Sequence, residues 1–204
     1  MNALVYCVRH GDTQLNAADC FRGNKDVLLN ADGKRDADTL SKMFAPMDFG
    51  AIVSSDRRRA KETAERIANP HKQKIEYDMN LRAWNVGTFS GKPKNDENLR
   101  LLDFFVEHPD QVIPDGESLN AFKERIKKAF ANLYEKAVST GRPIMAVSHS
   151  SVVHEIGSMI YGHHKSVLVD PGGAVAIYMQ GGRLAAKQIF KPRIEDIMSD
   201  IDIS

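Results

Sequence analysis

The stretch that decides the fold is residues 3–13, ALVYCVRHGDT, in which an apolar run ends abruptly in basic and polar residues. Residues 3–8 are a continuous apolar series rich in β-branched and aromatic side chains, which is typical of a strand covered on both faces. Runs of the same kind occur at residues 50–53 and 143–147. Each run is followed by a polar or basic cluster and then by a helical period. The pattern predicts repeated strand–helix units in a parallel sheet.

Helical periodicity fills much of the chain between these strands. Apolar side chains recur at helical spacing in residues 32–44, 56–67 and 118–137. Near the end, residues 174–179 and 184–190 flank Gly181-Gly182, a pair typical of a two-residue hairpin turn. We therefore expect an α/β fold with a doubly wound, mostly parallel sheet, flanked by helices and carrying an antiparallel edge. A short helix is expected after Pro192.

Length and composition limit the class of protein. A chain of 204 residues suits one domain over residues 1–204. The 28 Lys and Arg residues nearly balance the 27 Asp and Glu residues, which argues against a nucleic-acid polymer as partner. Cys7 and Cys20 are too few for a disulfide framework or a four-cysteine zinc site. Apolar runs are too short for a signal peptide or a membrane span, so we expect a cytoplasmic protein with no membrane partner.

Cations and imidazoles follow three of the predicted strands. Arg9 and His10 end the first strand, residues 54–59 (SSDRRR) follow the second, and His149 follows the third. Because the carboxyl ends of parallel strands meet at one edge, where helix N-termini bind anions, these groups are expected to form one site. Among the three successive arginines, Arg59 lies on the apolar side of its helix and is the expected ligand.

These motifs resemble those of the histidine phosphatase superfamily, also called phosphoglycerate mutase-like. Residues 9–13 (RHGDT) are similar to the family's opening Arg-His-Gly motif, which continues with Glu, Gln or Asp and then Thr. Further similar segments follow in the family's order, at residues 21–33, 54–64, 81–91, 116–118 and 147–149. The resemblance implies a phosphoglycerate mutase-like fold.

The resemblance also implies site residues. It makes His10 the nucleophile of a phosphohistidine intermediate, with Arg9, Arg59 and His149 as donors to the transferring phosphoryl group and Asn16 as a neutral donor. A neutral imidazole can attack phosphorus in line, and catalysis then depends on positioning and fixed cationic donors. No metal and no cofactor are implied, because the arginines supply the positive charge. Gly11 is expected where the backbone approaches the ligand closely.

Further substrate contacts are expected beside these groups. Arg22 and Gly23 stand where the family has a Gln-Gly pair, and Ser150 follows the second histidine. Trp84 is a candidate for stacking on a nucleoside or sugar face, with core packing as an equal alternative. Residues 92–115 are expected to form a cap over the site. Its apolar side chains, expected to pack mostly inward, are Leu101, Leu102, Phe104, Phe105 and Val106.

Position 83 departs from the family's pattern. The family's Leu-x-Glu loop supplies an acid that protonates the leaving oxygen and later deprotonates the attacking water. Here residues 81–84 read LRAW, and the methyl group of Ala83 carries no proton. Ser150 occupies the alternative acid position of some relatives. Three explanations stay open: Ala83 is an introduced substitution that stalls turnover, Glu117 or Asp115 supplies the proton instead, or the protein binds phosphorylated ligands without catalysis.

The leading interpretation is a metal-independent phosphatase acting on a small phosphomonoester, with activity reduced by Ala83. A phosphomutase is the alternative within the family. Mutases are usually longer between the acid loop and the Gly-Glu-Ser segment, whereas the segment between Gly91 and Gly116 is short, which favours a phosphatase. The strand before Gly181 is a candidate edge strand for a homodimer.

Overall fold

The computed structural model describes residues 3–162 and 167–191. Its centre is a six-stranded sheet in the order β3-β2-β4-β1-β5-β6. The strands are β1 (Ala3–Arg9), β2 (Ala51–Ser54), β3 (Ile75–Tyr77), β4 (Ile144–Ser148), β5 (Ala174–Gln180) and β6 (Arg183–Phe190). The first four pair in parallel, whereas β5 pairs antiparallel with both β1 and β6. This confirms the predicted mostly parallel sheet with an antiparallel side.

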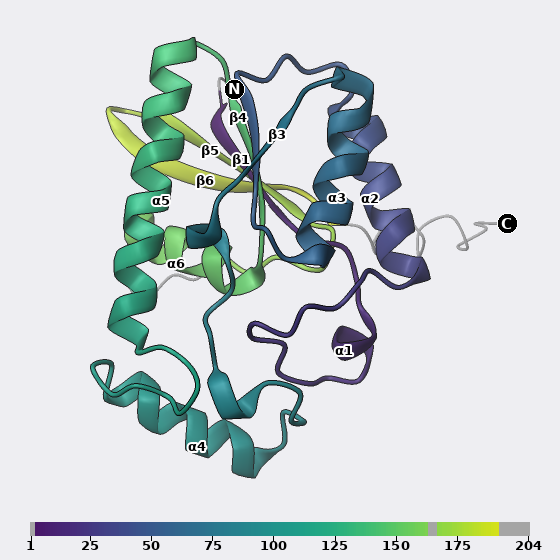
Figure 1. The fold of residues 1–204 in the computed structure, drawn as a ribbon. Coiled ribbons are helices and arrows are strands. Elements are labelled where there is room, and N and C mark those ends of the chain that lie inside the picture. Colours follow the sequence, from purple (N-terminus) through teal and green to yellow (C-terminus); the bar gives the residue numbers. More distant parts are fainter. Residues whose placement is uncertain (1–2, 163–166, 192–204) are drawn as a thin grey trace, which may run out of the picture.

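Helices cover both faces of the sheet (Figure 1). α2 (Ala31–Phe44) and α3 (Arg58–Ala68) lie on one face, and α5 (Leu119–Thr140) and α6 (Ser150–Tyr161) lie on the other. Alternate residues of β1 enter separate buried clusters: Val5 and Cys7 pack beneath α5 and α6, whereas Tyr6 and Val8 pack beneath α2 and α3. Burial on both faces explains why the β1 sequence is apolar without alternation.

The antiparallel side differs from the prediction in one respect. Gly181 and Gly182 form the hairpin turn, with φ values of 57° and 76°, as a type I′ turn requires. However, β5 is not an edge strand, because it is hydrogen-bonded to β1 and to β6, and the edge is β6. Strand β3 was not predicted, because three residues carry no readable period. The helix expected after Pro192 lies outside the described residues.

A group of shorter elements lies beyond the carboxyl ends of the parallel strands (Figure 1). α1 (Gln14–Ala17) and α4 (Asp96–Glu107) are both at this end of the molecule. Short 3-10 turns follow β3 at Met79–Leu81 and Gly87–Phe89, whereas the turn at Asn69–His71 precedes β3 at the opposite end of the sheet. A bridge between Cys20 and Pro93 and an ion pair between Lys94 Nζ and Asp19 Oδ1, 2.6 Å apart, join the α4 segment to the loop after α1.

The expectation that the apolar side chains of α4 mostly pack inward is wrong. Leu101, Phe104 and Val106 are 51%, 48% and 48% exposed. Only Leu102 and Phe105 of the five contact a small buried cluster, which consists of Phe21, Val86, Phe89 and Ile113. The cap therefore has a small core of its own and one apolar face in contact with solvent. None of the helices in the described ranges combines the length and the apolar character needed to cross a membrane.

Candidate active site

Three neighbouring strands bring the predicted groups to one edge of the sheet. β4 lies between β1 and β2, and the register aligns Arg9 with Ser148 and Ser54 with Val147. The backbone continues this alignment past the strands, because the amide of His10 donates to the carbonyl of Ser148 over 3.0 Å. Residues that are far apart in sequence therefore meet where α3 and α6 begin.

His10 is held as a neutral imidazole with a defined tautomer. Its side chain is 1% exposed, and its Nδ1 lies 2.7 Å from the carbonyl oxygen of Gly11. Because a carbonyl only accepts, Nδ1 carries the proton and Nε2 carries the lone pair. The Nε2 atom accepts a hydrogen bond from Nε of Arg59 over 3.1 Å. Burial, followed by the charges of Arg59 and Arg9, lowers the pKa of His10 well below its usual range.

Arg59 is the largest fully buried side chain of the described residues. It enters from the first turn of α3, and its guanidinium donates to the carbonyl oxygens of Lys25 at 2.6 Å and Gly23 at 3.0 Å. Burial, followed by the neighbouring charges of Arg22 and Arg57, lowers the pKa of Arg59 to about 9. The guanidinium therefore stays charged at neutral pH and is held rigidly against His10.

His149 lies beside His10 at the start of α6. The two ring centroids are 5.1 Å apart, and Nε2 of His149 is 2.9 Å from Oγ of Ser55. Its Nδ1 is buried and has no hydrogen-bond partner within the described part of the chain. Burial, followed by the charges of Arg59 and His10, lowers the pKa of His149. The second imidazole is therefore also uncharged at neutral pH.

Arg9 and Arg22 meet at Asn16. In the amide orientation that satisfies both side-chain atoms of Asn16, its oxygen accepts from Arg9 at 2.8 Å and from Arg22 at 3.3 Å. Its nitrogen then donates to Oγ1 of Thr13 over 2.6 Å. Arg9 also donates to the carbonyl oxygen of Val169 over 2.7 Å. These contacts hold two guanidinium groups close together, an arrangement suited to an anion.

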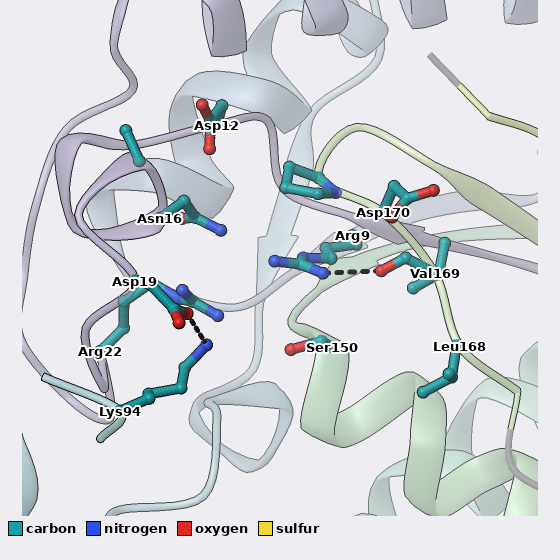
Figure 2. A pocket seen from close by; sticks show the side chains of 12 residues that line it. Arg9, Asp12, Asn16, Asp19, Arg22, Lys94, Ser150, Leu168, Val169 and Asp170 are labelled. Carbon is teal, nitrogen blue, oxygen red and sulfur yellow. Dashed lines mark hydrogen bonds and ion pairs between the residues drawn. The ribbon is translucent and has the colours of Figure 1, made fainter. Parts of the chain in front are cut away.

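Two adjoining cavities lie over these groups. The inner cavity has a volume of about 160 Å³ and includes His10, Arg59 and His149 in its wall. The outer cavity, of about 490 Å³, lies between the α1 side and residues 168–170 (Figure 2). Arg22, Lys94 and Ser150 line both. All predicted site residues line one or both: Arg9, His10, Asn16, Arg22, Gly23, Arg59, Ala83, Trp84, His149 and Ser150.

Neither of the two alternative acids lies at these cavities. The carboxylate of Glu117 pairs with Arg125 at 2.6 Å and accepts from the amide of Asn85 at 2.8 Å. Arg125 in turn donates to the carbonyl oxygen of Ala83 over 2.8 Å, so Glu117 helps to shape the loop that holds position 83. Asp115 is exposed and lines neither cavity. In this structure neither carboxyl lies at the wall of either cavity, so the alternative acids stay a prediction.

The structure also changes the explanation of Gly11. A Cβ atom there would clash with the carbonyl group of Gly33, and a Cβ at Gly33 would clash with the backbone of Asp12. Contact with the first turn of α2 therefore requires both glycines, and the approach of Gly11 to a ligand stays a prediction.

Two functional candidates were missed by the sequence analysis. Lys94 lines both cavities, and Ser55 contacts the second imidazole. The sequence signal that could have identified Lys94 is its position within the predicted cap. Ser55 falls within the basic cluster after β2. Trp84 lines the inner cavity, and its ring centroid lies 6.3 Å from that of Phe122. Its stacking on a nucleoside or sugar face stays a prediction.

A buried, uncharged imidazole that is framed by arginines at the carboxyl edge of an α/β sheet defines a class of protein that can hold a small anion against a histidine. The chain belongs to the histidine phosphatase superfamily (branch 1), whose family model matches residues 5–176. Similar curated relatives are called "Probable phosphoglycerate mutase GpmB". The Citrobacter koseri protein is 34% identical over 165 residues, covering 78% of this chain and 74% of the relative. The Salmonella arizonae protein is 33% identical over 170 residues, with the same coverage.

Solved structures show the same fold. Phosphoglycerate mutase from Bacillus anthracis matches with a TM-score of 0.78 at 24% identity, covering 94% of each chain. The alpha-ribazole phosphatase from Shigella flexneri matches with a TM-score of 0.76 at 23% identity, covering 92% of this chain and 96% of that one. Phosphoglycerate mutase from Thermus thermophilus has a TM-score of 0.72 at 26% identity, covering 92% of this chain and 99% of that one. The solved structures that share this fold thus include proteins called mutases and one called a phosphatase.

Proposed function

We propose that this chain is a metal-independent phosphatase that acts on a small phosphomonoester through a phosphohistidine at His10. The observation that carries this proposal is the tautomer of His10. Its Nδ1 proton is engaged by the carbonyl of Gly11, so the Nε2 lone pair lies at the wall of the inner cavity. An uncharged nitrogen in this position is the nucleophile that phosphoryl transfer needs.

The surrounding cations support the transfer step. Nε2 of His10 forms a bond to phosphorus as the bond to the leaving oxygen breaks, and negative charge spreads over the equatorial oxygens. A phosphoryl oxygen takes over the Nε–H of Arg59, which Nε2 accepts in the free protein. Arg9, Arg22 and the first turn of α6 add positive potential at the same place. These fixed groups supply the charge that a metal ion supplies in other phosphatases.

We expect Ala83 to slow the turnover of this chain. The inner cavity wall has a methyl group at this position, and loss of a general acid typically lowers a rate by about 10² to 10⁴-fold. The proposal therefore predicts slow phosphate release, which Ala83→Glu accelerates.

The test compares the unaltered chain with His10→Ala and Ala83→Glu on a broad panel of phosphomonoesters, with and without a chelator. The unaltered chain and Ala83→Glu are expected to form a phosphohistidine that survives alkaline quenching, and His10→Ala is not. Chelation is expected to leave the rates unchanged. A persistent adduct in His10→Ala would refute the nucleophile. Tight ligand binding without phosphate release, even with glutamate at position 83, would show a non-catalytic phospholigand-binding protein.

A phosphomutase is the second candidate, favoured by the curated relatives that are called probable phosphoglycerate mutases. A mutase returns the phosphoryl group from His10 to a second hydroxyl of the bound product, whereas a phosphatase gives it to water. Incubation with each phosphoglycerate isomer separates the two, because a mutase yields the other isomer faster than free phosphate. We expect free phosphate to be the main product.

A further inference from the structure

We infer that this site acts on phosphomonoesters whose leaving oxygen departs as a weakly basic anion, such as aryl or enol phosphates, rather than on esters of simple alcohols. This inference rests on the proposed function and narrows its substrate class. It follows from the groups that surround the inner cavity and from those that connect it to the outer one.

The first observation concerns proton donors. None of the described residues that line the inner cavity is Asp or Glu. The titratable groups there are His10, His149, Arg22, Arg59 and Lys94. His10 is the nucleophile, and His149 is uncharged because it is buried beside Arg59, so neither imidazole holds an acidic proton to give. A departing alkoxide needs such a proton, since it is a strong base, whereas a phenolate or enolate does not.

The carboxyl groups near the site are engaged or lie further out. Glu117 is bound by Arg125 and Asn85, and Asp19 is paired with Lys94. Asp12 and Asp170 line the outer cavity only, and Oδ2 of Asp12 accepts from Asn30 over 3.1 Å. The inner cavity, where the bond to phosphorus breaks, therefore has a wall of cations, neutral rings, hydroxyl groups and apolar side chains, without a carboxyl group among the described residues.

The second observation concerns the path of the leaving group. Arg22 and Lys94 line both cavities, so they flank the passage from His10 to the outer space. Fixed cations at the position where negative charge develops stabilise a departing anion without a proton transfer. The outer cavity, of about 490 Å³, has room for the body of a small organic leaving group. Electrostatic stabilisation by Arg22, together with Lys94, whose charge is shared with Asp19, takes the place of protonation.

The two steps balance without an acid or base from the protein. In the first, the Nε2 lone pair of His10 forms the N–P bond, and the P–O bond breaks with its electron pair on the leaving oxygen. In the second, water attacks phosphorus, the N–P bond breaks with its electrons returning to Nε2, and the proton of water passes to solvent. The second step lacks a general base, so the phosphohistidine accumulates when the first step is fast.

The experiment measures kcat/KM for a series of aryl phosphates of increasing leaving-group basicity, extended to an alkyl phosphate. The unaltered chain, Ala83→Glu and Ala83→Gln are compared, because glutamine matches glutamate in size but carries no acidic proton. Across the series, the rate of the unaltered chain is expected to fall about 10² to 10⁴-fold more than that of Ala83→Glu. The kcat/KM of Ala83→Gln is expected to fall across the series as steeply as that of the unaltered chain. The best leaving groups are expected to give a burst and a trapped phosphohistidine.

Each contrary outcome has one meaning. A rate on the alkyl phosphate equal to that on the aryl phosphates would overturn the inference while leaving the phosphohistidine intact. A steeper dependence in Asp12→Asn would show that a buried carboxylic acid supplies the proton, which also overturns it. The absence of a phosphohistidine from every substrate would instead overturn the proposed function. If Ala83→Glu does not fold, the unaltered chain still tests the inference. Its dependence on leaving-group basicity is then compared with that of uncatalysed hydrolysis in the same buffer.

Discussion

The Nε–H of Arg59 donates a hydrogen bond to Nε2 of His10 over 3.1 Å. Both side chains are buried, and the guanidinium is fixed from behind by the carbonyl oxygens of Gly23 and Lys25. A positive charge in this position disfavours a proton on Nε2, because two like charges would then share a site of low polarity. One arginine therefore keeps Nε2 of His10 unprotonated, and its Nε–H marks where a phosphoryl oxygen is expected to bind.

Replacing Arg59 with Lys is expected to lower kcat/KM for an aryl phosphate by about 10² to 10³-fold, because an ammonium group cannot reproduce the donors of the guanidinium fork. Arg58→Lys is the matched control, since Arg58 is the exposed neighbour in the same helical turn. Steady-state kinetics of the two variants measure the difference. Equal losses in both would show that general positive charge, rather than the placement of Arg59, matters.

The buried imidazoles predict a pH dependence of stability. The folded-state pKa values of His10 and His149 are lowered below the unfolded value of about 6.5. Between the folded-state and unfolded-state pKa values, the unfolded chain therefore binds more protons than the folded chain. Their contribution is complete above pH 6.5 and is lost as the pH falls below it, by up to about 1.4 kcal/mol per pH unit for each histidine.

Urea unfolding at a series of pH values tests this prediction. The unfolding free energy is expected to decrease from pH 7.5 to pH 5.5, and His149→Gln is expected to weaken that decrease by removing one of the two groups. A decrease of the same steepness in His149→Gln would assign the pH dependence to other residues.

Arg125 is expected to be the main support of the loop around position 83. It donates to the carbonyl oxygens of Asn80, Arg82 and Ala83 and pairs with Glu117. Arg125→Leu leaves those carbonyls and a largely buried carboxylate without their partner, so a loss of about 3 kcal/mol of unfolding free energy is expected.

Chemical denaturation of Arg125→Leu and of the unaltered chain measures this loss of unfolding free energy. Arg142→Leu serves as the control, because Arg142 pairs with Asp48 at the surface over 3.0 Å and such pairs contribute less than about 1 kcal/mol. Similar losses in the two variants would mean that the Arg125 contacts add nothing beyond an ordinary surface pair.

Gly33→Ala is expected to destabilise the protein, although alanine is the better helix former by about 1 kcal/mol. Its Cβ would clash with the backbone of Asp12, so the loop after His10 must shift away from α2. We expect a loss of about 1 to 3 kcal/mol together with reduced phosphohistidine formation. Lys34→Ala, at the next and exposed position, is expected to stay within about 0.5 kcal/mol of the unaltered chain in thermal unfolding. A more stable Gly33→Ala would show that helix propensity outweighs the contact.

The sequence alone predicts the layered fold because β1, β2 and β4 are buried on both faces and leave an uninterrupted apolar signal. It also predicts which edge of the sheet carries the site, since the carboxyl ends of parallel strands coincide. The burial of Arg59 follows from helical spacing alone.

Other features depend on contacts between distant segments and leave no local signal. The ion pair of Glu117 with Arg125 engages a carboxyl that the sequence analysis named as an alternative acid. Lys94 reaches the cavities only because the segment before α4 pairs with the loop after α1. The exposed face of α4 is as apolar as a buried helix face. Composition alone therefore does not show which face of this helix is buried.

The pairing of β1 with β4 has a consequence for how the protein becomes active. These central strands lie far apart in the sequence, so His10 and His149 meet only after a large loop has closed. Contacts of such long sequence separation form slowly, and a chain still under synthesis cannot make them until β4 has emerged. The ability to form a phosphohistidine therefore reports on completed folding, and its recovery in a refolding experiment is expected to follow the slowest phase.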